Sequence, residues 1–264
     1  MAFPAYRRSH RSTNGRAIAL FASDPLGAGN TKLIANLGVT PILFYDVRQN
    51  LTVAGGTASS LADVSGKGTY GAALAQATQA KQPTWNGTVL SFDGVTDFLL
   101  STAAIPGLDL SGPLTMAVVM DSTAPANKAV VCVGQADGTG QNWTPGSGTS
   151  TTPVHFTTLQ SGNAAGPDSG VALGGGLRLV LAYLNAATPA TTIEVPSQAL
   201  VSDATPGVAL TAGNKSFSLG ATAIGGAIGA LTFRAALCFA GNYTAAQRDV
   251  LKTWATTYHA AVLA

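Results

Sequence analysis

The chain has 264 residues, of which 46% are hydrophobic and only 10% are charged, and its formal net charge is +2. Soluble proteins carry about 25% charged residues, and a net charge this small does not indicate a general nucleic-acid-binding protein. No run approaches the roughly 18 apolar residues of a membrane span. The apolar run Ala17–Ala22 is too short for a signal peptide. We therefore expect a soluble protein that is made and assembled inside a cell, without a membrane partner.

The shortage of charge leaves Ser, Thr, Gly and Ala to cover much of the surface. One interpretation is a crowded assembly, such as a homo-oligomer, in which neighbouring subunits cover part of each face. The other is an ordinary β-sandwich with a surface rich in Thr and Ser. The composition leaves both open.

Basic residues are concentrated at the start of the chain. The first 23 residues contain no Asp or Glu, and the rest of the chain holds 10 basic and 12 acidic residues. The arginines of this segment are Arg7, Arg8, Arg11 and Arg16. Guanidinium groups pair well with carboxylates, so residues 1–41 are predicted to form an arm that docks onto an acidic neighbouring subunit. No aromatic residues alternate with the arginines, which argues against specific nucleic-acid binding.

Within this arm, the apolar runs Ala17–Ala22 and Lys32–Val39 are interpreted as short strands in an otherwise extended segment. From residue 42 onward, short β-type runs alternate with Gly, Pro, Asn and Asp, which is typical of a sandwich or barrel. The expected strands are Ile42–Val47, Val89–Phe92, Phe98–Ser101, Leu114–Asp121, Ala129–Gly134, Val154–Leu159, Leu177–Leu184, Thr192–Val195, Phe217–Gly220 and Ala230–Phe239. So many strands split into two packed antiparallel sheets.

Two of these runs, Leu114–Met120 and Leu177–Leu184, are almost continuously apolar, which predicts central strands that are buried on both faces. The segments Gln135–Pro153 and Ser161–Gly176 are rich in Gly, Thr, Ser, Asn and Asp and are interpreted as long loops.

One segment near the end of the chain predicts a helix. Thr244 followed by Gln247 has the spacing of a capping box. After it, an apolar stripe recurs at helical spacing through Val250, Leu251, Trp254 and Tyr258. We expect this amphipathic helix to lie on the sandwich and close it.

The two cysteines, Cys132 and Cys238, each lie inside an apolar strand. Buried thiols behave as small hydrophobic groups, so two unpaired core cysteines are the first interpretation. A disulfide between adjacent strands is the second.

Several segments, taken in order, resemble concanavalin A-like and laminin-G-like domains. They are Phe44-Tyr-Asp46, the turn Asp63-Val-Ser-Gly-Lys-Gly68, the strand and turn Phe92-Asp-Gly-Val-Thr-Asp-Phe-Leu99, and the closing helix at Tyr243–His259. The resemblance implies an all-β, two-sheet antiparallel jelly-roll sandwich over residues 42–264, with an extended N-terminal arm and a C-terminal helix.

Domains of this type occur in bacteriophage virion proteins. The resemblance therefore implies a virion structural protein, either a capsid decoration protein or a head or tail appendage, with other virion proteins as partners. The alternative that it implies is a module that binds carbohydrate or a receptor on the host surface.

Several features argue against catalysis. Glycoside hydrolases use a carboxylate pair, and Glu194 is the single glutamate. The three histidines, His10, His155 and His259, suggest no Ser-His-Asp arrangement. The sequence has no phosphate-binding loop, dinucleotide fingerprint or Cys/His metal cluster. We expect a protein that is not an enzyme and has no cofactor.

Two groups of residues are candidate binding sites. Asp93 and Asp97 flank Gly94, where carboxylates could bind Ca²⁺ or could cap a tight turn through hydrogen bonds to backbone amides. Trp143, with Gln141 and Asn142 beside it, could contact a glycan. The alternative is that Trp143 packs under its own loop.

Overall fold

The computed structural model describes residues 25–65, 72–123, 130–134, 142–145, 155–160, 167–185, 191–196, 198–202, 212–222 and 225–261. The helices in these ranges are α1 (Pro25–Leu37) and α2 (Ala245–His259), with a 3-10 turn at Gln79–Lys81. The strands of the first half are β1 (Leu43–Asp46), β2 (Leu51–Ala54), β3 (Thr57–Leu61), β4 (Leu74–Ala75), β5 (Thr84–Trp85), β6 (Leu90–Asp93), β7 (Leu99–Ser101), β8 (Ile105–Asp109) and β9 (Leu114–Asp121). Those of the second half are β10 (Val131–Gly134), β11 (Asn142–Pro145), β12 (His155–Gln160), β13 (Asp168–Ala172), β14 (Arg178–Leu184), β15 (Thr191–Glu194), β16 (Val201–Ser202), β17 (Asn214–Leu219) and β18 (Ala230–Ala240).

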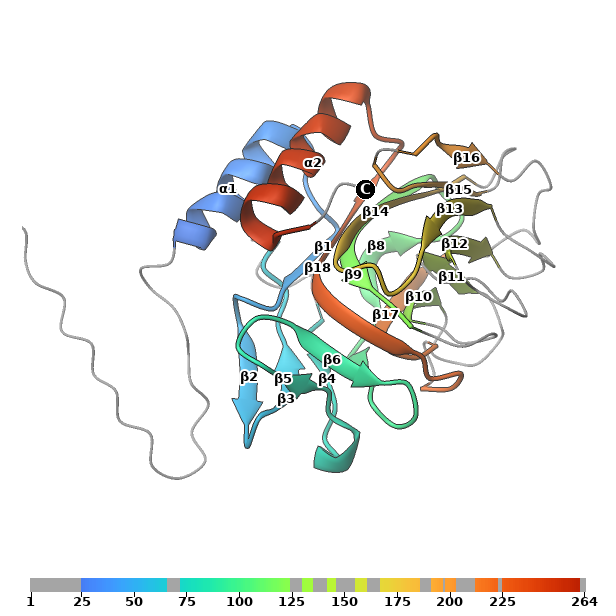
Figure 1. Cartoon of the computed structure of the whole chain (residues 1–264). Helices are drawn as coiled ribbons and strands as arrows, with labels where there is room; N and C mark the ends of the chain where they lie inside the picture. The colour runs from blue at the N-terminus through green and yellow to red at the C-terminus, as the bar shows by residue number, and fades with distance from the viewer. Residues whose placement is uncertain are drawn as a thin grey trace, which may run out of the picture.

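The strands form two antiparallel layers (Figure 1). The first, here called the helix-covered sheet, runs β18–β9–β14–β15–β16, with β1 and β6 both pairing with β18. The second, here called the outer sheet, runs β17–β10–β11–β12–β13, with β7 and β8 pairing with β17. Strands β3, β4 and β5 connect the layers along one edge. The expected all-β, two-sheet fold with a C-terminal helix is thus confirmed.

The helix-covered sheet is buried on both faces, as its apolar runs predicted. Along β9, Met116, Val118 and Met120 face the outer sheet, whereas Ala117 and Val119 face the helices. Strand β14 alternates in the same way. Successive side chains of a strand point to opposite faces, so a strand between two apolar layers has to be apolar at every position.

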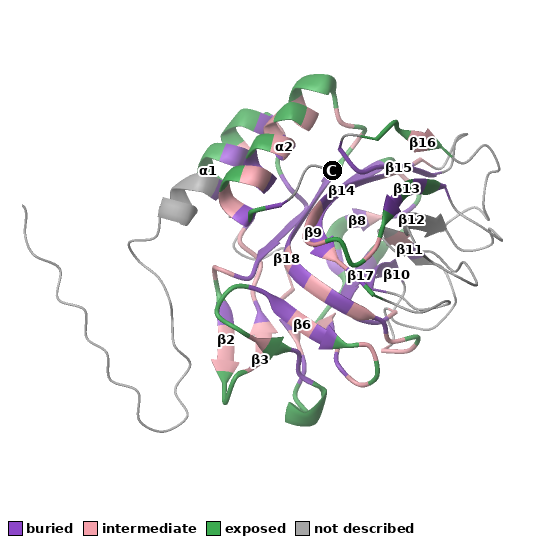
Figure 2. Cartoon of the chain, in the orientation of Figure 1, coloured by how far each residue is buried: buried purple, intermediate pink, exposed green. Residues whose placement is uncertain are grey.

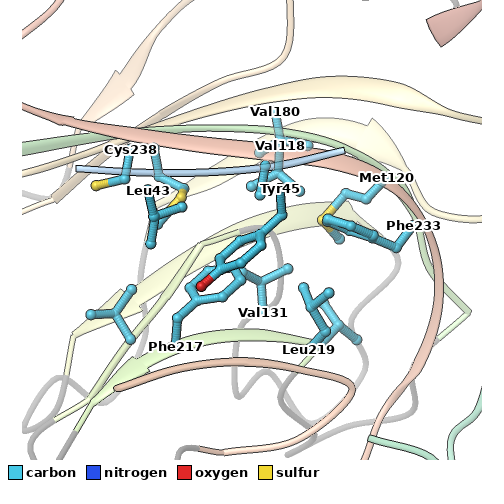
Figure 3. Packing of buried hydrophobic residues seen from close by; sticks show 14 of the residues in the cluster. Leu43, Tyr45, Val118, Met120, Val131, Val180, Phe217, Leu219, Phe233 and Cys238 are labelled. Carbon is cyan, nitrogen blue, oxygen red and sulfur yellow. The ribbon is translucent and has the colours of Figure 1, made fainter. Parts of the chain in front are cut away.

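The core between the sheets contains large aromatic side chains (Figure 3). Tyr45 from β1 stacks on Phe217 from β17, with ring centroids 5.4 Å apart. The Tyr45 hydroxyl donates a hydrogen bond to the carbonyl of Ala72 at 2.6 Å, so its one polar group is satisfied despite burial. This contact joins the two sheets directly.

Helix α2 starts as the sequence predicts. The Thr244 backbone N–H donates to the Gln247 side chain at 2.9 Å, and the Gln247 backbone N–H donates to the Thr244 hydroxyl at 3.2 Å, which completes the capping box. Leu251 and Trp254 are buried against the sheet. Figure 2 shows the opposite side of the helix exposed.

The strand expected at Lys32–Val39 is wrong, because this segment belongs to α1. Pro25 occupies the first position of the helix. Proline has no backbone N–H, but the N–H at this position would have no partner within the helix in any case. Gly38 follows the end of the helix at φ +65°. Leu33 and Leu37, four residues apart, are both buried against the helix-side core. The Gln247 side chain donates a hydrogen bond to the carbonyl of Leu37 at 2.9 Å, so α2 caps α1.

All ten strands expected in the sandwich are present within a few residues of their predicted bounds. The segments interpreted as long loops, Gln135–Pro153 and Ser161–Gly176, each contain a strand, β11 and β13. These strands are short and lie on either side of β12 in the outer sheet. The two segments are rich in Gly, Ser and Thr and lack the apolar pattern that indicates a strand in a sequence.

Cys132 and Cys238 are both buried and are not joined by a disulfide. They lie on β10 and β18, which belong to different sheets. Burial raises the pKa of the Cys238 thiol, so this group stays protonated and packs as a hydrophobic side chain.

Among the described residues, neither helix combines the length and the apolar character needed to cross a membrane.

Gly220 provides a test of the packing between the sheets. It has φ +77°, and a Cβ atom there would lie 2.6 Å from Phe92 Cδ1 and 2.7 Å from the carbonyl of Asp97. Gly241 has a similar φ of +88° but open space around the same position. We expect Gly241→Ala to lower the free energy of unfolding by about 1 kcal/mol through backbone strain, and Gly220→Ala to lower it by roughly 1–3 kcal/mol more through overpacking. Urea denaturation of both variants measures the difference, and equal losses would contradict it.

Candidate functional site

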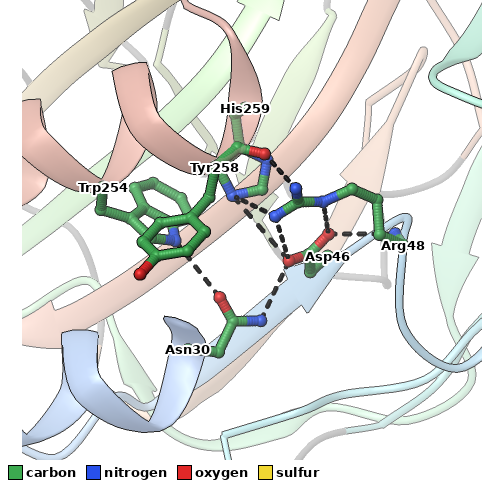
Figure 4. Close-up of polar contacts among 6 residues, drawn as sticks. All are labelled: Asn30, Asp46, Arg48, Trp254, Tyr258 and His259. Carbon is green, nitrogen blue, oxygen red and sulfur yellow. Dashed lines mark hydrogen bonds and ion pairs between the residues drawn. The ribbon is translucent and has the colours of Figure 1, made fainter. Parts of the chain in front are cut away.

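A polar cluster lies beneath the two helices (Figure 4). At its centre is Asp46, the last residue of β1, which has no exposed surface. Its Oδ1 accepts hydrogen bonds from the backbone N–H of Arg48 at 3.0 Å and from Arg48 Nε at 3.3 Å. Its Oδ2 accepts from Arg48 Nη2 at 3.3 Å and from Asn30 Nδ2 of α1 at 2.9 Å. One carboxylate thus holds four donors.

Arg48 links this carboxylate to the end of α2. Its Nη1 donates to the carbonyl of Tyr258, and its Nη2 lies 3.3 Å from Nε2 of His259. The same Nε2 lies 3.8 Å from Asp46 Oδ2. The other ring nitrogen, Nδ1, has no hydrogen-bond partner among the described residues. The free carbonyls that end a helix need donors, and Arg48 supplies one.

The charges within the cluster depend on its burial. The pKa of His259 is lowered to about 3, chiefly by burial and also by Arg48 and Arg234, against the opposing effect of Asp46. For Asp46, burial raises the pKa, but His259, Arg48 and the hydrogen bonds from Arg48 and Asn30 lower it below its usual value. Since His259 is neutral at neutral pH, Arg48 is the charge that holds Asp46 ionised there.

The same cluster fixes the position of Trp254. The Trp254 indole N–H donates to Asn30 Oδ1 at 3.2 Å, and the ring meets Phe44 and His259 edge-on at centroid distances of 5.8 Å and 4.4 Å. Trp254 is 1% exposed. It therefore forms a rigid floor between α1 and α2.

Above this floor the two helices leave a groove with a volume of about 390 Å³. It is lined by Lys32, Leu33 and Asn36 of α1 and by Asp249, Val250, Thr253, Trp254, Thr257 and Tyr258 of α2. This volume falls within the range of roughly 300–1,000 Å³ that small-molecule sites occupy. We call it the α1–α2 groove.

The walls of the α1–α2 groove carry polar groups around an apolar floor. Lys32 and Asp249 are both exposed. Neither side chain has a hydrogen-bond or ion-pair partner within the described ranges. Every other acidic side chain in those ranges has a hydrogen bond or an ion pair. Among the described carboxylates, Asp249 is thus the one that takes part in no hydrogen bond or ion pair within the fold.

A second polar group lies where α2 begins. Glu194, at the end of β15, is 1% exposed, and its Oε1 lies 2.9 Å from Arg248 Nε. Its Oε2 accepts a hydrogen bond from the Tyr243 hydroxyl at 2.7 Å. Burial raises the pKa of Tyr243, and the hydrogen bond to Glu194 raises it further. Both oxygens of Glu194 therefore hold the start of α2 on the sheet.

The structure places Asp93 and Asp97 in a tight turn. Asp93 Oδ1 accepts from the backbone N–H groups of Val95, Thr96 and Asp97 at 2.8–2.9 Å, and Asp97 Oδ2 accepts from the N–H of Asp93 at 3.2 Å. Burial raises the pKa of Asp93, but these bonds lower it to about 2. The contacts are those of the turn interpretation, and calcium binding stays a prediction.

The glycan contact expected at Trp143 is wrong. Its ring is completely buried in the core between the sheets, so it offers no surface to a ligand. Asn142 lies in β11, but its side chain is outside the described part of the chain, and so is Gln141. The four arginines of the arm, Arg7, Arg8, Arg11 and Arg16, also lie outside the described residues.

The residues of the polar cluster and the groove were not singled out as a site in the sequence. In the sequence, Asp46 is notable only as part of a family-like strand, and His259 only as a histidine near the end of a predicted helix. A Pro25 and Gly38 pair that bounds a helix was the available signal for α1. No signal in the sequence brings residues 30, 46 and 259 together, because they are far apart in the chain.

Among the residues that the structure describes, no three His, Cys, Asp or Glu side chains come together as metal ligands would.

No family model and no curated protein sequence matches this chain. Its fold is similar to that of a GH54 α-L-arabinofuranosidase soaked with a cyclic sulfate inhibitor, with a TM-score of 0.62 and 10% identity over 84% of this chain and 64% of that one. An arabinofuranosidase complexed with arabinofuranosyl-α-1,2-xylobiose matches with a TM-score of 0.58 and 13% identity over the same shares. A Trypanosoma rangeli sialidase with a covalent intermediate matches with a TM-score of 0.57 and 12% identity, over 89% of this chain and 39% of the sialidase.

These neighbours overturn the expectation that the chain is not an enzyme, because chains named as glycoside hydrolases have a similar fold. That expectation rested on Glu194 being the single glutamate, whereas the carboxylate pair of a glycoside hydrolase can also contain aspartate. At 10–13% identity the likeness shows the fold alone. The chain spans less than two thirds of the length of these neighbours.

The pKa of His259 provides a test of the polar cluster. Below pH 6.5 the unfolded chain takes up a proton at this residue, whereas the folded chain does so only near pH 3. The stability that the neutral ring contributes is therefore complete above pH 6.5 and is lost as the pH falls toward 3, by up to about 1.4 kcal/mol per pH unit. The His259→Gln variant has no ionisable group at this position, so its stability does not fall with pH for this reason. We expect the difference in free energy of unfolding between wild type and variant to narrow between pH 6.5 and 4.5 in urea denaturation. A difference that stays constant with pH would contradict the buried neutral histidine.

Proposed function

We propose that the chain is a carbohydrate-recognition module on a concanavalin A-like sandwich, and that the α1–α2 groove holds the sugar. The observation that carries the proposal is the lining of this groove. It joins an exposed carboxylate and an exposed ammonium group, neither used elsewhere among the described residues, to the partly exposed aromatic ring of Tyr258.

The chemistry of the groove suits a sugar. A sugar ring presents apolar C–H faces and a rim of hydroxyl groups. Tyr258 and Val250, both partly exposed residues of α2, supply aromatic and apolar surface. Asp249 can accept hydrogen bonds from hydroxyls, and Lys32 can donate to them from the opposite wall. Few, fixed polar groups around an apolar floor are the usual composition of a ligand site.

The structural neighbours lend support through the sugars that two of them bind. One arabinofuranosidase is described in complex with arabinofuranosyl-α-1,2-xylobiose, and a Trypanosoma rangeli sialidase is described in complex with sialic acid. Both therefore bind sugars on chains that contain a fold similar to this one. The same neighbours favour a second candidate function, glycoside hydrolysis, which the assay below also detects.

We expect the full chain to bind at least one sugar in a glycan array that includes arabinofuranosyl-α-1,2-xylobiose and sialic acid. Titration calorimetry then gives the dissociation constant for the best ligand. Lys32→Gln and Asp249→Asn should each raise that constant about tenfold, because a hydrogen bond to a charged group contributes roughly 1.5–3 kcal/mol.

Lys252→Gln is the matched control. It removes the same charge from the same pair of helices, but Lys252 does not line the groove. Its dissociation constant should equal that of the wild type. Absence of any bound sugar, or equal affinities in all variants, would contradict the proposal. Release of free sugar from the ligand during the titration would instead identify a hydrolase.

We also propose that the chain is a phage virion component docked by its N-terminal arm, with the sandwich displayed on the particle. The observation that favours this role is the concentration of four arginines in a stretch of 23 residues without Asp or Glu. Such an arm complements an acidic surface on a capsid or tail subunit. Sugar recognition on a host surface is compatible with this role.

Deletion of residues 1–20 tests the docking role. These residues precede α1 and every strand in the described part of the chain, so we expect the shortened chain to keep the circular dichroism spectrum and thermal midpoint of the full chain. It should no longer sediment with particles of the phage that encodes it. Replacement of Arg7, Arg8, Arg11 and Arg16 by Ser should have the same effect. Retention on particles in both variants would refute arm docking.

A further inference from the structure

The turn that connects β5 to β6 places an asparagine directly before a glycine. Asn86 and Gly87 follow Trp85, the last residue of β5, and both are exposed. Gly87 has φ +92°, and nothing lies within 4 Å of the position that a Cβ atom would take there. Its N–H donates to no acceptor among the described residues. The backbone nitrogen of Gly87 is therefore accessible and free to react.

The side chain of Asn86 folds back over this glycine. Its Oδ1 accepts hydrogen bonds from the backbone N–H groups of Thr88 and Val89, each at 2.9 Å. An oxygen that reaches the N–H two residues further on closes an Asx turn, and the ring so formed passes through the peptide of Gly87. The carbonyl carbon Cγ of Asn86 is thereby held beside the backbone nitrogen of Gly87. Within the described part of the chain, the Nδ2 atom of Asn86 makes no hydrogen bond that would hold it in place.

Both N–H groups point at the atom where charge develops in an attack on Cγ. When a nitrogen adds to an amide carbonyl, the carbonyl oxygen becomes negative, and backbone N–H groups that are already in place stabilise it. Effective donors lie roughly 2.7–3.1 Å from that oxygen, and the two donors of this turn lie at 2.9 Å. Glycine favours the attack as well, because it has no Cβ to obstruct the nitrogen and adopts a positive φ without strain.

We propose that Asn86 is a modification site at which the chain deamidates itself, with water as the only co-reactant. A base removes the proton of the Gly87 N–H, and the nitrogen forms a bond to Cγ of Asn86. The bond from Cγ to Nδ2 then breaks, and Nδ2 takes up a proton and leaves as ammonia. Water opens the resulting succinimide at either of its two carbonyls, which gives aspartate or isoaspartate at this position. The site is separate from the α1–α2 groove and does not depend on sugar binding.

The modification changes both the charge and the backbone of this turn. The added carboxylate lowers the formal net charge from +2 by one. Isoaspartate also adds one atom to the main chain, between strands whose register is set by the pairs Thr84↔Ser91 and Trp85↔Leu90. Strand β5 pairs with β3 as well, so a longer turn disturbs the edge at which the two sheets connect.

The test is incubation of the full chain at pH 7 and at pH 9, followed by peptide mapping in a mass spectrometer and an assay of released ammonia. We expect Asn86 to become a mixture of aspartate and isoaspartate, faster at pH 9 because a base removes the proton of the attacking nitrogen. A synthetic peptide of residues 84–90 is the reference without the fold, and the folded chain should react at least as fast. Asn242, which is also exposed but precedes Tyr243, is the internal control and should keep its amide.

Thr88→Pro removes one of the two donors to Oδ1 and should slow the conversion in the folded chain by about tenfold or more. Thr88→Ser is the matched control, because it keeps the backbone N–H, and its rate should equal that of the wild type. Circular dichroism shows whether each variant folds. If Thr88→Pro does not, the comparison of the wild type with the peptide decides the proposal.

The proposal fails if Asn86 keeps its amide in the folded chain while the peptide loses it, which is the behaviour of a side chain held away from Gly87. It also fails if Asn242 is converted as fast as Asn86, or if Thr88→Pro folds and reacts at the rate of the wild type.

Discussion

The rest of the structure depends on a sheet that is buried on both faces. Strands β9, β14 and β18 have apolar side chains at nearly every position, so water must be excluded from both sides. The outer sheet covers one side and the helix pair covers the other. The helices are therefore a structural requirement of the sheet. Their groove and the polar cluster below it follow from this arrangement.

Covering a sheet with helices creates an electrostatic problem at the helix ends. The last carbonyls of α1 and α2 accept no hydrogen bond from an N–H donor within their own helices. Gln247 donates to the last carbonyl of α1, and Arg48 donates to that of Tyr258 near the end of α2. Arg48 is in turn held by the buried Asp46. Removing one partner of such a buried pair is costly, because it leaves the other charge uncompensated.

Most of the few acids in this chain serve its backbone. Asp63 accepts from the N–H of Phe44, Asp109 from that of Ser111, and Asp121 from those of Gly174 and Gly176. A carboxylate at a turn satisfies amides that no strand can pair. Against this background, Asp249 stands out as a described carboxylate that accepts no hydrogen bond and forms no ion pair, and the proposal for the α1–α2 groove rests on it.

The sequence by itself determined ten strands of the sandwich and the start of α2, because these depend on local periodicity and on a capping pair four residues long. It also contained the Pro25 and Gly38 bounds of α1, which an apolar run over Lys32–Val39 obscured. Only the tertiary structure decided that Trp143 is core and that Asn30, Asp46 and His259 meet. Those facts depend on which face of a strand is covered and on contacts between distant segments, and a local pattern carries no information about either.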